Sequence, residues 1–456
     1  MIHKFKLGGF NIILDVNSGG VHSVDELTYD LLDFAAPPFD EENLKACINA
    51  LSDRYGKDDI KEAFDEVKKL YDEKILFSED DYEKYAKYSV ASPIKAMCLH
   101  IAHDCNLRCK YCFASTGDFG EGRKLMSFET GKAAIDFLLN NSGDRVNLEL
   151  DFFGGEPLMN FDVVKQIVRY ARSKEKEYNK NFRFTITTNG MLLTDDKIDF
   201  INEEMSNVVL SIDGRKEVND RLRVRVDGRG SYDKILDGYK RLVAKRGDKD
   251  YYVRGTYTKY NLDFSNDVMH LYDLGFDQVS VEPVMADKEL PFAITDDDIE
   301  AISREYEVLT EKLENIRENG GFCNFFHFML DLDQGPCAIK RLRGCGSGNE
   351  YVAITPDGDI YPCHQFVGIP EFKMGNLEDG TFDMEMKKRF AATHVYAKED
   401  CKKCWAKFYC SGGCNANNFL YEGDILKAHK LSCKLQKKRL ECAIMLQIKR
   451  HLEKEA

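Results

Sequence analysis

Three cysteines lie close together in segment 103–113, which reads His-Asp-Cys-Asn-Leu-Arg-Cys-Lys-Tyr-Cys-Phe. Cys105, Cys109 and Cys112 have the spacing C-x3-C-x2-C, with an aromatic residue before the last cysteine. Three thiolates on one short loop can bind three irons of a four-iron cluster, which leaves the fourth iron open to a chelating ligand. A zinc knuckle is the alternative, but zinc would need a fourth nitrogen or sulfur ligand nearby. The loop therefore predicts a catalytic iron-sulfur cluster.

A second group of seven cysteines lies between Cys345 and Cys433. Seven thiolates nearly suffice for two further four-iron clusters, since each takes four thiolates when fully ligated. Taken in isolation, the segment 401–414 would also fit a zinc ribbon. The expected metal ligands are Cys345, Cys363, Cys401, Cys404, Cys410, Cys414 and Cys433. Cys337 lies eight residues before Cys345, close enough to serve as an eighth ligand, and its role is left open.

Several glycine-rich and polar motifs could hold a small ligand near the first cysteine loop. In the segment 154–157, Gly-Gly-Glu-Pro, the glycines let the backbone approach a ligand, and Glu156 can accept a hydrogen bond from an ammonium group. Ser211 and Asp213 could bind hydroxyl groups of a ligand, and either Arg223 or Arg254 could bind its carboxylate. The predicted ligand site comprises Phe113, Gly154, Gly155, Glu156, Thr188, Asn189, Ser211, Asp213, Arg223 and Arg254. Singly, the polar ones fit helix caps, turns or surface ion pairs equally well.

These motifs recur at the ends of strand-like segments that alternate with helical ones. Residues 94–102, 146–153, 182–187, 208–212, 251–257 and 278–282 are predicted as buried strands, because they are rich in β-branched and aromatic residues. Six strand-helix units predict an α/β fold, a partial (β/α)6 barrel. Chemistry in such barrels lies at the carboxyl ends of the strands, so the motifs are expected to face one cavity.

Two further regions flank the predicted barrel. Residues 1–90 combine short strand-like runs with three helical segments, which predicts a separate winged-helix-like domain. Residues 91–321 form the barrel, closed by a helix over 299–319. Residues 322–456 are rich in Gly and Cys until a final basic helix, and such a segment is expected to need metal to fold.

Composition and charge narrow the function classes. The 456 residues include 43% hydrophobic and 31% charged residues, as in ordinary soluble proteins. A net charge of −14 argues against a nucleic-acid partner, and no segment is apolar enough for a signal peptide or membrane span. Fifteen cysteines, an odd number without a secretion signal, favour metal binding in a cytoplasmic protein over disulfides.

The first cysteine loop and the Gly-Gly-Glu-Pro motif resemble the radical S-adenosylmethionine (radical SAM) superfamily. The spacing from Cys345 to Cys433 resembles the SPASM extension, which binds auxiliary clusters, and residues 1–90 resemble the peptide-recognition element of enzymes that modify ribosomal peptides. Four short sequence motifs are similar to those of the SCIFF-peptide maturases: 1–5 (MIHKF), 14–20 (LDVNSGG), 151–155 (DFFGG) and 362–366 (PCHQF). This last similarity covers nearly the whole chain.

The resemblance implies a sactisynthase-type reaction. S-adenosylmethionine and three [4Fe-4S] clusters would be the cofactors, and a 5′-deoxyadenosyl radical would take hydrogen from the α-carbon of a peptide residue, expected to be Thr. A peptide Cys would then bond to that carbon as a thioether. The family pattern assigns Cys401, Cys404, Cys410 and Cys433 to one auxiliary cluster, and Cys345, Cys363 and Cys414 to the other. The second cluster is closed if Cys337 binds it, and otherwise keeps an iron open to a substrate thiolate.

The expected partners are a ribosomal precursor peptide, whose leader residues 1–90 would bind, and an electron donor such as a flavodoxin or ferredoxin. A leader could add as a strand to an edge at residues 10–16. Two alternatives stay open: a maturase of the sulfatase or amine-dehydrogenase type that acts on a larger protein, and a zinc-stapled binding protein without catalysis. No general base is assigned.

Overall fold

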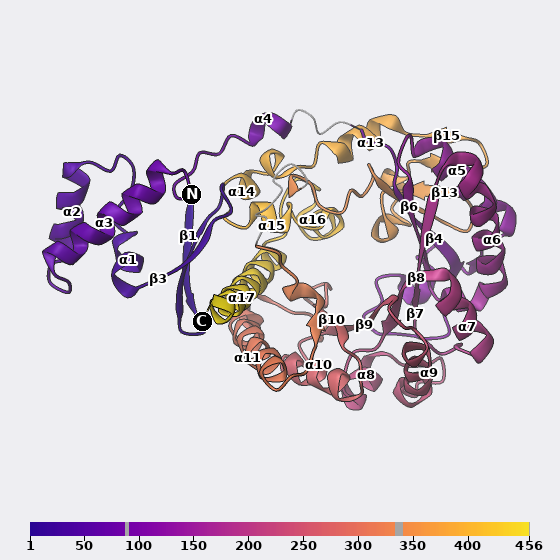
Figure 1. The fold of residues 1–456 in the computed structure, drawn as a ribbon. Coiled ribbons are helices and arrows are strands. Elements are labelled where there is room, and N and C mark those ends of the chain that lie inside the picture. The colour runs from indigo at the N-terminus through magenta and orange to yellow at the C-terminus, as the bar shows by residue number, and fades with distance from the viewer. Residues whose placement is uncertain (87–90, 333–340, 456) are drawn as a thin grey trace.

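The computed structural model describes residues 1–86, 91–332 and 341–455, and its centre is a curved parallel sheet (Figure 1). Six neighbouring strands follow the order β4, β6, β7, β8, β9, β10, and every neighbouring pair is parallel. All six predicted strands are confirmed. Their bounds are β4 Ala96–His103, β6 Asn147–Gly154, β7 Asn181–Thr188, β8 Met205–Ser211, β9 Asp250–Tyr257 and β10 Gln278–Pro283.

Helices cover the outer face of this sheet, and strand side chains alternate between the helices and the barrel interior. In β6, Leu148, Leu150 and Phe152 are fully buried, whereas the intervening Glu149 is exposed and Asp151 is half-buried. This alternation is expected for a strand packed on one face by helices. The helices are α5 Phe128–Asn141, α6 Phe161–Tyr178, α7 Asp195–Glu204, α8 Lys216–Leu222, α9 Tyr232–Ala244, α10 Phe264–Asp273 and α11 Ile299–Glu318.

The C-terminal region continues the barrel sheet. Strand β12 (Tyr351–Ile354) pairs in parallel with β4, and short antiparallel strands follow it. The last helix, α17 (Lys430–Glu455), packs along α11. The remaining elements are β5 Lys124–Leu125, β11 Asn324–Phe325, β13 Asp359–Tyr361, β14 Gly375–Asn376, β15 Thr381–Phe382, α13 Met384–Ala391, α14 Glu399–Lys402, α15 Lys407–Cys410 and α16 Asn415–Glu422.

The N-terminal module has the predicted strands and helices. Its elements are β1 Ile2–Leu7, β2 Phe10–Asp15, β3 Val21–Val24, α1 Glu26–Leu31, α2 Glu41–Leu51 and α3 Lys57–Asp72, followed by the short helix α4 Glu83–Ala86. The strands form an antiparallel sheet in the order β1, β2, β3. Segment 10–16 is therefore the centre of the sheet, and the prediction that it offers an edge is wrong: hydrogen bonds to both neighbours occupy its backbone.

Both faces of the N-terminal sheet are covered, and the division of the chain at residue 90 stays a prediction. Ile13 packs into the core of the module itself, whereas Ile12 and Leu14 belong to the core shared with the rest of the chain. Each such fully buried aliphatic side chain contributes about 1.5–3 kcal/mol. After α3, Asp80 accepts hydrogen bonds from Tyr396 and Lys407, so the linker is tied to the C-terminal region as well.

No helix in the part of the chain that the structure describes is long and apolar enough to cross a lipid bilayer.

Candidate active site

The three-cysteine loop leaves the end of β4 and is tied to the segment that follows α8. The backbone N–H of Arg108 donates to the Val224 carbonyl at 2.7 Å, and that of Lys110 donates to the Leu222 carbonyl at 2.9 Å. Burial raises the pKa of the Cys105 thiol to about 12 and that of Cys109 to about 11. The metal-free thiols therefore keep their protons, and a bound metal must displace them.

Asp213, just after β8, is hydrogen-bonded to the cysteine loop. Its carboxylate accepts hydrogen bonds from Tyr111 Oη at 2.7 and 2.9 Å, from Arg223 Nε at 2.8 Å and from the Thr256 backbone N–H at 3.0 Å. Asp213 and Tyr111 are thereby joined across the barrel mouth. Because these protein donors use the carboxylate, the geometry favours a positioning role for Asp213, and its predicted contact with a ligand hydroxyl stays a prediction.

Glu156, fully buried after β6, organises the end of β7. It accepts hydrogen bonds from Thr188 Oγ1 at 2.7 Å and from the backbone N–H of Asn189 at 2.8 Å. Burial raises the pKa of Glu156 to about 7 against the lowering effect of these bonds. Asn189 in turn places its Nδ2 3.5 Å from Cys105 Sγ. The structure thus brings four of the predicted site residues, from three different loops, into one contact network.

The two glycines before Glu156 allow close contacts between backbone segments. A Cβ atom on Gly154 would lie 2.3 Å from the Ala102 carbonyl oxygen, and one on Gly155 would lie 2.1 Å from the Asp104 carbonyl oxygen. The glycines are needed because the backbone passes β4 closely at Gly154 and the start of the cysteine loop closely at Gly155. Their predicted role in close approach of a ligand stays a prediction.

Gly155→Ala is expected to displace the cysteine loop, because the added methyl group meets backbone atoms that no side-chain rotation can move. Overpacking of this kind costs about 1–3 kcal/mol, which predicts about tenfold weaker S-adenosylmethionine binding, measured by equilibrium dialysis on the reconstituted protein. Gly238→Ala in α9 is the matched control, since its Cβ would make only ordinary contacts with Leu193 at 3.4 and 3.6 Å. Equal binding by both variants would contradict this reading of Gly155.

The remaining predicted site residues lie around the barrel mouth. Phe113 is 52% exposed and its ring centroid lies 5.5 Å from that of His364. Ser211 ends β8, and its hydroxyl makes no hydrogen bond among the described residues. Arg223 is committed to Asp213 and Arg254 to Glu282, so each of the two arginines predicted for a carboxylate ligand already has a protein carboxylate.

Glu282 is the centre of a charged group in the barrel. Burial would raise the pKa of its carboxyl, but Arg254, His327 and Arg439 together lower it to about 2. Arg439 comes from α17 and donates toward His327 Nδ1 at 3.1 Å. The C-terminal helix therefore contributes charge to the barrel interior, beside the strands that carry Ser211 and Arg254.

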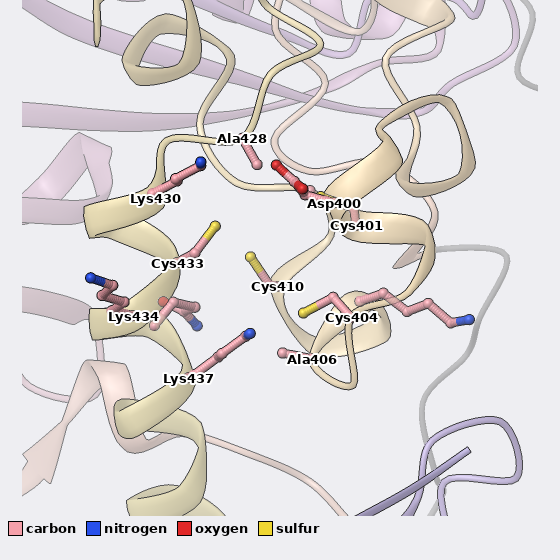
Figure 2. Close-up of a pocket in the computed structure, with 13 residues that line it drawn as sticks. Asp400, Cys401, Cys404, Ala406, Cys410, Ala428, Lys430, Cys433, Lys434 and Lys437 are labelled. Atoms are coloured by element: carbon pink, nitrogen blue, oxygen red, sulfur yellow. The ribbon is translucent and has the colours of Figure 1, made fainter. Parts of the chain in front are cut away.

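Four of the C-terminal cysteines line one cavity of about 300 Å³ between α14, α15 and α17. They are Cys401, Cys404, Cys410 and Cys433. Figure 2 shows the sulfur atoms of Cys404, Cys410 and Cys433 pointing into the same space. Burial, with a smaller contribution from the neighbouring thiols, raises the pKa of Cys401 to about 12 and that of Cys433 to about 11.

The other three predicted ligands form a third set. Burial, followed by the proximity of Cys414 and Cys345, raises the pKa of Cys363, and Cys345 also raises that of Cys414. Cys345 itself is exposed. Cys337 lies outside the described residues, so its ligand role stays open.

The spacing of the thiols can be compared with that of a zinc site. A zinc ion bound by four thiolates at about 2.3 Å holds its sulfur atoms about 3.8 Å apart. In residues 1–86, 91–332 and 341–455, no three cysteine sulfurs lie within 4.8 Å of one another. The described thiols are therefore not arranged as a closed zinc site, and the assignment of the C-terminal cysteines to iron-sulfur clusters stays a prediction.

Comparison with known proteins gives the family. Residues 99–262 match the model of the radical SAM superfamily, and residues 345–405 match that of the SPASM iron-sulfur cluster-binding domain. An uncharacterised protein of Methanocaldococcus jannaschii is 32% identical over 296 residues, which is 63% of this chain and 90% of that protein. The chain belongs to the radical SAM enzymes of the SPASM type. S-adenosylmethionine and [4Fe-4S] clusters are typical cofactors of such enzymes.

Three named proteins show what this radical SAM enzyme is similar to. The cysteine-type anaerobic sulfatase-maturating enzyme of Clostridium novyi is 26% identical over 337 residues, 69% of this chain and 86% of the relative. SuiB of Streptococcus suis, solved bound to S-adenosylmethionine, shares the fold with a TM-score of 0.53 at 19% identity, over 93% of this chain and 97% of SuiB. The sulfatase-maturating enzyme anSMEcpe, with bound S-adenosylmethionine, has a TM-score of 0.64 at 20% identity, over 78% of this chain and 98% of its own.

Sequence reasoning missed several residues that hold the site of the radical SAM enzyme. Tyr111 was visible only as the aromatic residue before Cys112, and nothing in the sequence linked its hydroxyl to Asp213. The Leu222–Val224 backbone, which binds the cysteine loop, carries no motif at all, because only main-chain atoms take part. Lys398, buried beside the auxiliary cysteines, reads in the sequence as one of many surface lysines.

Proposed function

We propose that this enzyme forms thioether crosslinks between Cys side chains and the α-carbons of Thr residues in a ribosomally made, Cys-rich peptide. The observation that carries this proposal is the N-terminal sheet, which leaves one strand edge open and is fixed beside the auxiliary cysteines. Precursor-peptide binding by a similar structure, SuiB solved bound to its precursor peptide SuiA, supports a peptide substrate.

The open edge is β3, because the opposite edge strand, β1, packs against the C-terminal region. His3 of β1 stacks on Trp405 with ring centroids 3.8 Å apart and lies 3.1 Å from Glu441 of α17. Figure 1 shows β1 alongside α17, whereas β3 faces away from this helix, towards α1. An extended leader peptide could pair with β3 through backbone hydrogen bonds, the general mode of β-strand addition.

The register shows which β3 residues would meet the leader. Asp15 N donates to the Gly20 carbonyl, and hydrogen-bonded and non-bonded pairs alternate along an antiparallel ladder. Leu14 opposite Val21 and Ile12 opposite Ser23 therefore fall at non-bonded positions. The N–H and C=O groups of Val21 and Ser23 point away from β2 and are available to a partner strand.

The reaction needs a cofactor site and a substrate site that face each other. When bound at the first cysteine loop, the reduced cluster and S-adenosylmethionine would supply a 5′-deoxyadenosyl radical that can abstract a hydrogen atom from carbon. Cys105, Cys109 and Cys112 would bind the cluster, and Glu156 with its neighbours Thr188 and Asn189 would orient the methionyl group. The charged group around Glu282 would give polar contacts to the peptide backbone in the barrel.

The auxiliary cysteines would hold two further clusters, three in total. One would use Cys401, Cys404, Cys410 and Cys433, and the other Cys345, Cys363 and Cys414. With three thiolates, the second cluster would leave an iron open to the substrate thiol, unless Cys337 closes it. A flavodoxin or ferredoxin would supply the electrons.

A second candidate is maturation of a sulfatase-type protein, which the sulfatase-maturating relatives favour. The match to anSMEcpe covers 78% of this chain and 98% of anSMEcpe. The match to SuiB covers 93% of this chain. We take residues 1–86 as the feature that separates the two candidates, because a peptide leader has a use for this module.

Mass spectrometry of a Cys-rich precursor peptide co-expressed with the enzyme tests the proposal. Each crosslink is expected to remove two hydrogens from the peptide mass, and fragmentation should place the linkage on a Thr α-carbon. An unmodified peptide together with conversion of a sulfatase Cys or Ser would favour the second candidate instead.

A further inference from the structure

Lys398 is a lysine almost completely withdrawn from solvent, with 1% of its surface exposed. It lies directly before α14, three residues before Cys401. Its ammonium group donates to the Gly412 carbonyl at 2.8 Å and to Asn415 Oδ1 at 3.0 Å. Among the described residues it forms no ion pair with a carboxylate, which is unusual because buried charges are generally paired.

The groups around Lys398 come from both auxiliary cysteine sets. Gly412 lies in the loop between Cys410 and Cys414, and its backbone has a left-handed conformation, φ +90°. A Cβ atom at this position would lie 3.4 Å from Lys398 Nζ, so the glycine leaves room for the ammonium group. Asn415 follows Cys414 directly. Its Nδ2 donates to Ser347 Oγ and Thr393 Oγ1, which turns Oδ1 toward Lys398.

Cysteine thiols are the acidic groups with the largest influence on this ammonium in the described part of the chain. Burial lowers the pKa of Lys398, and Cys401, Cys410, Cys414 and Cys433 oppose that shift. Cys401, Cys410 and Cys433 belong to the four-cysteine cavity, whereas Cys414 belongs to the set with Cys345 and Cys363. The hydrogen bonds place Lys398 between the two sets, because Gly412 lines the four-cysteine cavity and Asn415 follows Cys414 directly. The thiols become permanent anions only when metal is bound.

We propose that Lys398 is the shared buried counter-cation of the two auxiliary clusters, a positioning and tuning residue that contacts neither substrate nor S-adenosylmethionine. This inference rests on the proposed function, which places clusters at both cysteine sets. A fixed positive charge in a low-dielectric site favours the more negative, reduced state of a neighbouring cluster. Lys398 thereby raises the reduction potentials of both clusters and stabilises the holoenzyme.

Redox titration of the reconstituted full-length enzyme, followed by electron paramagnetic resonance, tests this role. Lys398→Met removes the charge and is expected to shift the one-electron equilibrium of at least one auxiliary cluster about tenfold toward the oxidised form, a potential lower by about 59 mV. Lys398→Arg keeps the charge and should keep the potential near that of the wild type. Lys403→Met is the control, because Lys403 is adjacent to Cys404 but exposed, so solvent screens its charge.

Each outcome decides the question. Lys398→Met with full iron content and unchanged potentials would overturn the proposal, since a purely hydrogen-bonding role alters stability and leaves potentials alone. If Lys398→Met loses auxiliary iron, retention of iron by Lys398→Arg supports the counter-cation role, and equal loss by both variants overturns it. Wild-type enzyme without any auxiliary iron would refute the proposed function as well, whereas unchanged potentials with crosslinking intact would refute only the role of Lys398.

Discussion

Replacement of Cys105, Cys109 and Cys112 together by Ala is expected to abolish the formation of 5′-deoxyadenosine while leaving peptide binding and the auxiliary iron in place. The three thiols lie on one loop held by backbone bonds to Leu222 and Val224, far along the chain from the C-terminal sets. Removing a whole catalytic unit leaves no partial activity to compensate, so the loss should exceed about a thousandfold. Liquid chromatography of the nucleoside product measures it.

Iron analysis supplies the control for this variant. The loss should amount to about four irons per chain, one cluster, with the remainder unchanged. Cys323→Ala is the matched single substitution, because Cys323 is a half-buried thiol outside all three sets, and it should retain both iron and activity. Persistent cleavage of S-adenosylmethionine by the triple variant would show that the first cluster has been assigned to the wrong cysteines.

The barrel could be predicted from the sequence because its signals are local. Strands such as β6 and β9 are rich in apolar and aromatic residues, and each is followed by a segment in which apolar residues recur with helical spacing. The thiol sets were also visible, since ligand spacing along a loop constrains metal geometry directly. The position of Glu156 beside Cys105 followed from topology, because the carboxyl ends of parallel strands meet at one edge.

Other features could not be predicted because they depend on contacts between distant segments. The order of the N-terminal sheet, which makes β2 central, is set by tertiary pairing that the strand sequences do not encode individually. The ion pair between Arg254 and Glu282 joins β9 and β10, and the sequence does not show that these two charges meet. The two glycines at 154–155 make room for backbone atoms of β4 and of the cysteine loop, and only the structure places these atoms against them.

The open edge of β3 leads to the second large expected effect. Val21→Pro together with Ser23→Pro removes the two backbone N–H groups that point away from β2, while the donors that pair with β2 belong to His22 and Val24. Proline is tolerated on edge strands, and the residues before it keep an extended backbone, so the module should stay folded. Two lost backbone hydrogen bonds, each about 1 kcal/mol, predict about thirtyfold weaker leader binding.

Val21→Ala with Ser23→Ala is the matched control, since it trims the same side chains and keeps both N–H groups. Fluorescence of Trp405, the only tryptophan in the chain, reports whether β1 still stacks on the C-terminal region in each variant. Fluorescence polarisation of a labelled leader then gives the affinity. Point substitution is more informative than deletion of residues 1–90. Deletion would also expose Trp405 and the part of the shared core that Ile12 and Leu14 cover. If the proline variant binds the leader as tightly as the alanine variant does, the leader does not add to β3, and the peptide must be recognised elsewhere on the module.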